Sequence, residues 1–359
     1  MENKKRFSNG KWAIAFLCEL IMIILLVWAN IRVYISNKMA LVKHADNFTV
    51  NVNEGTAKNQ KGYTNIALFG LDARDQSSES LENGTRSDSI IIVSINNSTG
   101  DIKMVSVYRD TLFRISDMDG MTTKANAAYA YGGPEMAVNT LNENLDMNIT
   151  EFVSINWTGL TKAIDAMGGI DIEIKENEID KLNEYIAHVI DTTGIYSDGV
   201  FEAGMQTLNG VQATAYARIR STDQGDITRT ERQRTIINAM VKKLKNSSWS
   251  TVDTAIEAAL PCVYTSMDED DIYSLAKKVL KYEMAGNQGF PFRYEFYSSE
   301  SKGSCIAAAD LNENVSALHE YLFGKKGYVP STTVQGISAD LTNETGTGSC
   351  GDINLSGDE

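Results

Sequence analysis

Pairs of arginine and aspartate lie at the ends of three consecutive apolar segments of this sequence. The segments span residues 65–71, 89–95 and 102–107, and the pairs are Asp72 with Arg74, Arg86 with Asp88, and Arg109 with Asp110. Because α/β sheets bind ligands at one edge, just beyond the strand ends, we expect the pairs to converge there. A single pair has a simpler interpretation, a solvated turn whose ion pair contributes at most about 1 kcal/mol. Three pairs at one edge favour a binding site.

A second group of charged residues lies further along the chain. Arg218 and Arg220 are two residues apart, so their side chains share a side where the backbone is extended. The residues that share one face of the following helix are Asp226, Arg229 and Gln233, with Arg232 three residues after Arg229. An isolated helix would expose such a face to solvent. Here the two faces are distinct, because apolar residues occupy the rest of the helix, at Ile236, Ile237, Met240 and Val241.

Arginine clusters with nearby carboxylates suit a phosphate-bearing substrate. Guanidinium groups bind phosphate oxygens through paired hydrogen bonds, and aspartates hold hard cations such as Mg²⁺. Phosphoryl transfer needs positioning and charge stabilisation more than a covalent nucleophile, so a chain with only 3 His can perform it. The sequence has no G-x-x-x-x-G-K-[ST] motif, which excludes a P-loop nucleotide enzyme. Its 4 Cys include no C-x-x-C, which excludes a zinc module.

The elements that position these residues alternate between strands and helices. We expect strands over residues 65–71, 89–95, 102–107, 152–155, 170–174 and 290–297. We expect helices over residues 134–145, 160–167, 207–217, 228–245, 266–280 and 315–322. This alternation predicts an α/β fold, a layered αβα domain with a central mixed sheet.

Composition and charge limit the class of protein. The chain has 359 residues, of which 43% are hydrophobic and 22% charged, as in one large packed domain with appendages. A net charge of −14 argues against a generic nucleic-acid binder. From residue 246 onward there are 17 acidic and 7 basic residues, so most of the acidity lies outside the arginine-bearing segment. That segment can therefore be locally basic.

The first 60 residues indicate a membrane anchor. Residues 1–11 are basic, and residues 12–35 are predominantly apolar with Glu19 as the only acidic group. We expect a transmembrane helix over 12–35, preceded by a cytoplasmic N-terminus and followed by a juxtamembrane linker over 36–60. A cleaved signal peptide is the alternative, but its apolar region would be shorter and end in small residues. Glu19 has either a functional role or a contact near the membrane edge.

Two further segments complete the predicted organisation. Residues 61–328 form the extracytoplasmic domain, with the motifs concentrated in 62–245. From Ser331 onward the chain contains no Lys or Arg and much Gly, Ser and Thr. We therefore expect residues 329–359 to form a disordered acidic tail.

The ordered set of motifs between residues 62 and 240 resembles the LytR–CpsA–Psr (LCP) family of Gram-positive cell-envelope proteins. The matching stretches are Gly70–Arg74, Arg86–Asp88, Arg109–Thr111, Lys124–Gly133, Ile164–Ile170, Leu208–Gly210, Tyr216–Arg220 and Asp226–Gln233. The sequence to about residue 328 fits the usual C-terminal flank of the family more loosely. Tyr108 stands where the family usually has proline, and the spacer between Asp72 and Asp88 is somewhat long.

This resemblance implies an LCP-type phosphotransferase. Such an enzyme would move a glycopolymer from an undecaprenyl-pyrophosphate carrier to a peptidoglycan sugar hydroxyl, outside the cytoplasmic membrane, with the lipid in an apolar channel. By analogy Asp72 and Asp88 would hold Mg²⁺ or Mn²⁺. The implied catalytic residues are Arg86, Arg109, Asp226 and Arg229, and the implied pyrophosphate-binding residues are Arg74, Arg109, Arg218, Arg220, Arg229, Arg232 and Gln233. The identity of the polymer stays open: it is teichoic acid, capsule or another wall polysaccharide.

Two other functions remain open at this point. A pyrophosphate hydrolase of lipid-linked intermediates would use the same residues with water as the acceptor. A non-enzymatic envelope or transcription regulator is disfavoured, because the sequence shows no helix-turn-helix pattern and no nucleic-acid partner is expected. We expect Arg109 and Arg229 to be exposed at the site, so that their removal leaves folding intact. Cys262 and Cys305 would form either a disulfide or two buried thiols.

Overall fold

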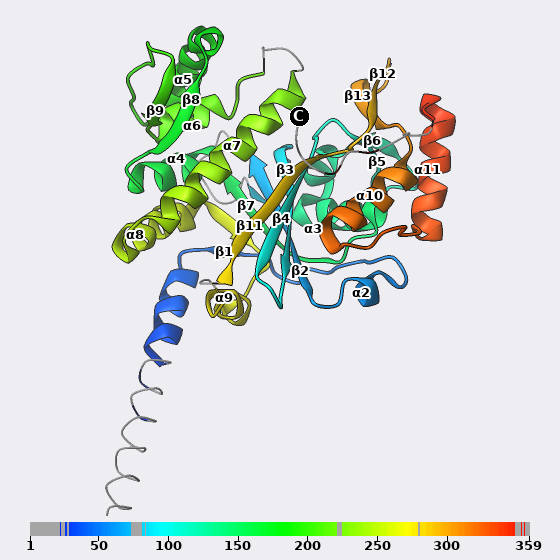
Figure 1. The fold of residues 1–359 in the computed structure, drawn as a ribbon, viewed down its shortest axis with the longest axis horizontal. Helices are drawn as coiled ribbons and strands as arrows, with labels where there is room; N and C mark the ends of the chain where they lie inside the picture. The colour runs from blue at the N-terminus through cyan, green and yellow to red at the C-terminus, as the bar shows by residue number, and fades with distance from the viewer. Residues whose placement is uncertain are drawn as a thin grey trace, which may run out of the picture.

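The structure, a computed structural model, describes residues 22, 26, 29–72, 81–82, 84–220, 225–278, 281–348, 353 and 355. A seven-stranded sheet runs through the middle of the molecule, with helices on both faces (Figure 1). The order across the sheet is β1 (Lys43–His44), β10 (Val263–Thr265), β7 (Ile149–Asn156), β2 (Tyr63–Leu71), β3 (Ser87–Asn96), β4 (Asp101–Val107) and β11 (Glu283–Phe290). Strands β2, β3 and β4 are antiparallel, whereas β7 is parallel to β2 and β11 is parallel to β4. The predicted α/β fold with a central mixed sheet is confirmed.

Different helices cover the two faces of the sheet. On one face lie α3 (Ala127–Leu145), α10 (Leu311–Phe323) and α11 (Thr332–Thr345), which share one core with alternate side chains of β2, β3 and β4. On the other face lie α4 (Trp157–Ala166), α7 (Asp226–Lys245) and α9 (Glu269–Ala276). Successive side chains of a strand point to opposite faces. The runs of Ile and Val in β3 therefore supply both layers, as buried strands require.

A small lobe stands beside the sheet. It consists of β8 (Ile170–Ile174), β9 (Gly204–Leu208), α5 (Ile179–Thr193) and α6 (Gly210–Tyr216), around its own apolar core. The strand predicted over 170–174 is confirmed but pairs only with β9, outside the central sheet. The helix predicted over 207–217 begins later than expected, because Leu208 ends β9 and Asn209 caps α6.

The remaining elements are short. Two antiparallel pairs flank the large core, β5 (Leu112–Arg114) with β6 (Thr122–Lys124) and β12 (Tyr294–Ser299) with β13 (Gly303–Ala308). The strand predicted over 290–297 is divided between β11 and β12, because Pro291 has no N–H to continue the ladder. Helix α8 (Trp249–Ala259) lies beside α4, and the short helix α2 (Thr56–Asn59) belongs to the N-terminal segment 36–60. Cys262 and Cys305 are buried free thiols.

The prediction of a disordered tail is wrong for Thr332–Thr345. Residues Thr332–Thr345 form α11, and Val334, Ile337 and Leu341 are buried in the large core. Ser331 caps the helix, and its side chain also donates to Asp146 at 2.6 Å. These apolar residues recur at helical spacing and bury one stripe of α11 together with Ser338, whereas Gly336 lies on its exposed side.

The N-terminal segment contacts the domain. Most of the predicted transmembrane helix, 12–35, lies outside the described residues; within them, residues 29–39 are helical. No helix in the described part of the chain is both long and apolar enough to cross a membrane. Arg32 pairs with Asp270 at 2.6 Å. The segment 36–60 is not a free linker, because it contributes β1 to the sheet and buries Thr56 and Gln60.

Candidate active site

Asp72, Asp88 and Arg109, one residue from each of the three predicted pairs, meet at one edge of the central sheet. Leu71, the last residue of β2, is paired with Ser87 at the start of β3, and Val107 at the end of β4 is paired with Ile90 of β3. Antiparallel neighbours place the end of β2, the start of β3 and the end of β4 together. The predicted convergence of Asp72, Asp88 and Arg109 on one edge is therefore confirmed.

Asp88 is the carboxylate that the arginines share. Arg109 Nη1 donates to Asp88 Oδ1 at 2.6 Å, and Arg220 Nη2 donates to Asp88 Oδ2 at 3.2 Å. Arg229 Nη1 lies 3.5 Å from Asp88 Oδ2, while its Nη2 donates to the backbone carbonyl of Asp88 at 3.1 Å. Burial alone would raise the pKa of Asp88, but the three guanidinium groups hold that pKa below its usual value.

Asp226 is a second buried carboxylate in the same cluster. It begins α7, and its Oδ1 lies 2.8 Å from Arg229 Nη2, one turn further along the helix, and 3.0 Å from Arg109 Nε. Burial raises the pKa of Asp226 despite these two arginines. Asp226 and Arg229 thus lie on one face of α7, as the helix spacing predicted. Asp110 belongs to the same cluster, because it lies 3.6 Å from Arg109 Nε and pairs with Lys124 at 3.0 Å.

A polar cavity of about 220 Å³ opens beside this cluster. Its lining includes three arginines and two aspartates that sequence reasoning identified: Asp72, Asp88, Arg218, Arg220 and Arg229. Arg218 Nη2 lies 3.5 Å from Asp72 Oδ1. Arg109 and Asp226 lie directly behind, and Asp110 contacts both Arg109 and Lys124. Five cationic side chains therefore face four carboxylates, an excess of one positive charge that suits an anion.

The helix α6 places Arg218 and Arg220 because it packs tightly against α4. A Cβ at Gly210 would lie 2.0 Å from the carbonyl oxygen of Thr161, so only glycine allows this approach. Gly210 N also donates to Asp165 Oδ1 at 2.6 Å. Close contact between α4 and α6 brings the turn that follows α6, at residues 217–218, and then Arg220 to the edge of the sheet. The extended backbone expected for Arg218 and Arg220 is therefore not found at Arg218.

An apolar cavity of about 290 Å³ lies next to the polar one. The sheet supplies one wall through Leu68 and Ile91, and α4 supplies Leu160. The opposite wall comes from α7, through Gln233, Ile236, Ile237, Met240, Val241 and Leu244. The two faces of α7 that the sequence distinguished therefore face different cavities. Asp226 and Arg229 belong to the charge cluster beside the polar cavity, whereas the apolar residues line the apolar cavity, which we call the apolar slot.

Trp157 lines both cavities, and sequence reasoning missed it. It follows Asn156, which is paired with Leu71 because β7 is parallel to β2. The guanidinium carbon of Arg218 lies 5.7 Å from the centroid of the Trp157 ring, a cation–π contact. Tyr185 and His188 of α5 also line the polar cavity. The strand before Asn156 was predicted, but its parallel partner, which brings Trp157 to the site, was not visible in the sequence.

Two predicted site residues lie elsewhere, and a third falls outside the described residues. Arg232 does not face the cavity, because its Nε and Nη2 donate to Glu178 and its Nη1 donates to the carbonyl of Ile219. Arg86 is exposed and is not among the residues that line the polar cavity. Arg74 lies outside the described residues.

The expectation that Arg109 and Arg229 are exposed is wrong. Arg229 is only 1% exposed, and the side chain of Arg109 is enclosed by Asp88, Asp110 and Asp226. Both side chains are embedded because the carboxylates around them lie within the wall of the site rather than on its surface.

The aspartates predicted to hold a metal face one cavity. Asp72 and Asp88 both line the polar cavity, and Mg²⁺ commonly uses one or two protein carboxylates together with substrate phosphates. Among the residues that the structure describes, no group of three or more His, Cys, Asp or Glu side chains could hold a metal ion. The donor set therefore fits an ion that arrives with a phosphate ligand, rather than a metal held by protein side chains alone.

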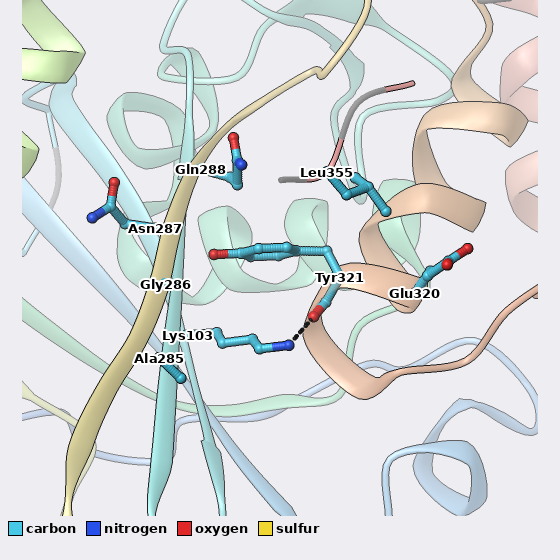
Figure 2. A pocket seen from close by; sticks show the side chains of 8 residues that line it. All are labelled: Lys103, Ala285, Gly286, Asn287, Gln288, Glu320, Tyr321 and Leu355. Atoms are coloured by element: carbon cyan, nitrogen blue, oxygen red, sulfur yellow. Dashed lines mark hydrogen bonds between the residues drawn. The ribbon is translucent and has the colours of Figure 1, made fainter. Parts of the chain in front are cut away.

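Another cavity, of about 550 Å³, lies between the edge strand β11 and α10 (Figure 2). It contains one basic side chain, Lys103, whose Nζ donates to the carbonyl of Tyr321. In Figure 2 Asn287 and Glu320 point away from the Tyr321 ring, so the polar groups do not converge. None of the predicted site residues lines this cavity, which makes it a useful control location.

The fold and the site together define an α/β protein with an anion cavity joined to an apolar slot. The LytR_cpsA_psr family model matches residues 29–301, and the chain belongs to this family. The family predicted from the ordered motifs is confirmed.

Curated relatives carry transferase names. The chain is 34% identical over 185 residues to the polyisoprenyl-teichoic acid–peptidoglycan teichoic acid transferase TagV of Bacillus subtilis, covering 51% of this chain but 45% of TagV. It is 30% identical over 274 residues to the transferase TagU of Enterococcus faecalis, covering 75% of this chain and 84% of TagU. This chain thus spans less than half the length of TagV.

Solved structures share the fold. The crystal structure of B. subtilis TagV superposes with a TM-score of 0.55 at 26% identity, covering 75% of this chain and 99% of that one. The LytR-CPS2A-psr family protein YwtF (TagT), solved with bound octaprenyl pyrophosphate lipid, superposes with a TM-score of 0.53 at 20% identity, covering 85% and 99%. At that lower identity the likeness establishes the fold alone.

Proposed function

We propose that this protein is a phosphotransferase that moves a glycopolymer from a polyprenyl-pyrophosphate carrier, undecaprenyl pyrophosphate, to a sugar hydroxyl of peptidoglycan. The observation that carries this proposal is the junction at Trp157 between an arginine-lined cavity and an apolar slot. A lipid pyrophosphate has a charged head and a long apolar tail, so it needs both cavities side by side. The names of the relatives TagU and TagV support this reaction class.

The reaction forms one phosphorus–oxygen bond and breaks another. The acceptor hydroxyl oxygen attacks the phosphorus on the polymer side of the pyrophosphate, and the bridging oxygen leaves with the lipid as a monophosphate. The hydroxyl proton is released, and the polymer ends in a phosphodiester to peptidoglycan. Arg218, Arg220 and Arg229 would stabilise the charge that accumulates on the phosphoryl oxygens.

A divalent cation, Mg²⁺ or Mn²⁺, would be held by Asp72 and Asp88 together with oxygens of the pyrophosphate. When bound, it supplies positive charge that offsets that of the pyrophosphate. Asp88 already contacts Arg109 and Arg220, so it orients these side chains whether or not the ion is present.

The membrane anchor and its orientation also belong to this proposal. Residues 12–35 would span the cytoplasmic membrane with the N-terminus inside, which places the domain on the side where peptidoglycan is built. The ion pairs of helix 29–39, Arg32 with Asp270 and Lys38 with Asp253, support a fixed attachment of the domain to that anchor.

The test is transfer of a radiolabelled lipid-linked wall polymer by the full chain, with and without peptidoglycan. We expect labelled peptidoglycan and lipid monophosphate only when peptidoglycan is present. Arg220→Ala should lower transfer, because its guanidinium lines the polar cavity. The matched control, Gln288→Ala in the cavity of Figure 2, should leave the rate unchanged.

Two results would contradict the proposal. Equal release of lipid monophosphate without peptidoglycan would identify a pyrophosphate hydrolase instead. Absence of both products, with the polymer still bound to its carrier, would remove the enzymatic function altogether. Omitting Mg²⁺ in the presence of a chelator tests the cation separately, and an unchanged rate would contradict the role given to Asp72 and Asp88.

A further inference from the structure

Three buried N–H groups at the boundary between the cavities have no hydrogen-bond acceptor among the residues that the structure describes. They are Asn156 Nδ2, Trp157 Nε1 and Gln233 Nε2. Their residues are 1%, 4% and 6% exposed, and all three line the apolar cavity. Buried polar groups are nearly always paired, because leaving one unpaired costs free energy. Three unpaired donors around one cavity point to an acceptor that arrives with a ligand.

The other contacts of these residues leave the three donors available. Asn156 uses its Oδ1 to cap α4, accepting from Gly159 N at 2.9 Å, which leaves its amide nitrogen unused. The ring of Trp157 packs against Arg218 through its face, which leaves the indole N–H in the ring plane. Gln233 lies one turn after Arg229 on α7. The donors therefore come from β7, α4 and α7, and lie where the apolar walls meet the arginines.

We propose that Asn156, Trp157 and Gln233 form a collar of neutral donors for the phosphate that remains attached to the lipid. The arginines would then bind the phosphate on the polymer side. This inference rests on the proposed function and deepens it, since it divides the two phosphates of the carrier between two sets of donors. The new assignment is the pair Asn156 and Trp157, which also fixes how far the lipid enters the slot.

There is a chemical reason to bind the lipid-side phosphate with neutral donors and the polymer-side phosphate with arginines. After transfer the lipid-side phosphate becomes a monoester with an additional negative charge, and it must leave. Neutral donors bind an anion less strongly than guanidinium groups do. A neutral collar can therefore position the lipid phosphate during the reaction without retaining the product, whereas an arginine at the same place would hold it.

The test compares three probes that differ only at the head group: farnesyl pyrophosphate, farnesyl monophosphate and farnesol. Binding is measured with the full chain in detergent micelles. Trp157→Phe keeps an aromatic ring but removes the N–H. We expect it to weaken binding of both phosphates about tenfold, as for loss of one hydrogen bond to a charged group, and to leave farnesol binding unchanged. Gln233→Met keeps the side-chain volume but removes the amide donor, and it should likewise weaken binding of both phosphates and leave farnesol binding unchanged. If Trp157→Phe does not fold, this second variant tests the inference.

The matched control is Trp249→Phe, the same substitution at a side chain that is 66% exposed on α8, and it should change none of the three affinities. Unchanged phosphate binding in both collar variants would overturn the inference while leaving the proposed function intact. Equal loss of all three probes would also overturn it, because the residues would then act by packing alone. A wild-type chain that binds neither prenyl phosphate would overturn the proposed function, and the collar with it.

Discussion

Arg229 connects the two buried carboxylates of the site. It lies 2.8 Å from Asp226 and 3.5 Å from Asp88, and is 1% exposed. Arg220 contacts the same Asp88, yet 44% of its side chain is exposed. Removing a partner of a buried ion pair leaves an uncompensated charge in a poorly solvated place, whereas removing a surface partner does not. The two arginines should therefore differ in what their loss does.

Arg229→Ala should abolish polymer transfer and also lower the free energy of unfolding, by about 3–5 kcal/mol, because Asp88 and Asp226 lose a buried partner. Arg220→Ala should lower transfer while changing the free energy of unfolding by less than about 1 kcal/mol. Urea denaturation followed by fluorescence, together with the transfer assay, checks both values. Equal stability of the two variants would show that Arg229 does not compensate those carboxylates.

Tyr108 shows how this chain accommodates a departure from the usual family pattern. Its backbone N–H donates to the carbonyl of Phe290 at 2.9 Å, which joins the end of β4 to β11. Proline, the usual family residue, could not make this bond. The position of Arg109 is nevertheless kept, as its contact with Asp88 shows.

Tyr108→Pro should therefore be less stable than Tyr108→Ala by about 1–3 kcal/mol, because both variants lose the buried ring and only proline also deprives a buried carbonyl of its donor. Tyr108→Ala is the control, since it keeps the backbone bond. Thermal unfolding of the two variants measures the difference. A proline variant as stable as the alanine variant would mean that the bond between β4 and β11 contributes nothing here.

Among the elements, α11 shows most clearly that amino-acid composition alone does not decide whether a segment folds. Ile337 is completely buried against the large core, whereas the next residue before it, Gly336, has open space around it. A polar and glycine-containing segment can still fold when one narrow stripe is apolar and a core is available to receive it.

Substitutions on opposite sides of α11 should have opposite effects. Ile337→Ala should lower the free energy of unfolding by about 2–5 kcal/mol, because it leaves a cavity in the core. Gly336→Ala should raise it by about 0.5–1 kcal/mol, because alanine favours the helix and meets no neighbour. Denaturant titration measures both. If neither variant differs from wild type, α11 does not contribute to the folded domain.

At the scale of the whole molecule, the candidate site and the N-terminal helix 29–39 lie at opposite ends of the central strands. The site is at the end of β2, whereas α9, which pairs with Arg32, packs near Ile66 and Ile95 at the other end. Figure 1 shows helix 29–39 leaving the domain on that side. The apolar slot lies between the sheet and α7, on the face of the sheet that α4, α7 and α9 cover.

A buried histidine links the helices on the other face. His319 of α10 is completely buried, its Nε2 lies 3.0 Å from the carbonyl of Leu145 at the end of α3, and its ring stacks on Tyr328. Burial lowers the pKa of His319 to about 4. Its unfolded value is about 6.5, so between these values the unfolded chain binds more protons than the folded one.

Stability should therefore fall as the pH is lowered from about 6.5 to about 4, with His319 contributing about 3 kcal/mol of the loss. His319→Gln lacks this titration, so the difference in unfolding free energy between wild type and variant should shrink on acidification. Urea denaturation at several pH values measures it. A constant difference across this range would show that His319 is protonated equally in both states.

Local patterns predicted many of the strands and helices, although not α11, and they indicated the class of ligand. Hydrophobic periodicity predicted the strands 65–71 and 89–95 and the helix that carries Arg229, because that signal depends only on neighbours within a few residues. The arginines and aspartates indicated a phosphate ligand because their bonding preferences are properties of the side chains. Their order along the chain was enough to predict the family, which the comparison confirmed.

Only the tertiary structure decided which of these residues share a site. Arg229 and Arg232 are three apart on one helix, yet one contacts Asp88 and the other Glu178, because the packing of α7 between the sheet and the small lobe sets which direction each faces. Trp157 reaches the site only through the parallel pairing of β7 with β2. Such choices depend on contacts between segments far apart in the chain, and spacing within a segment carries no information about them.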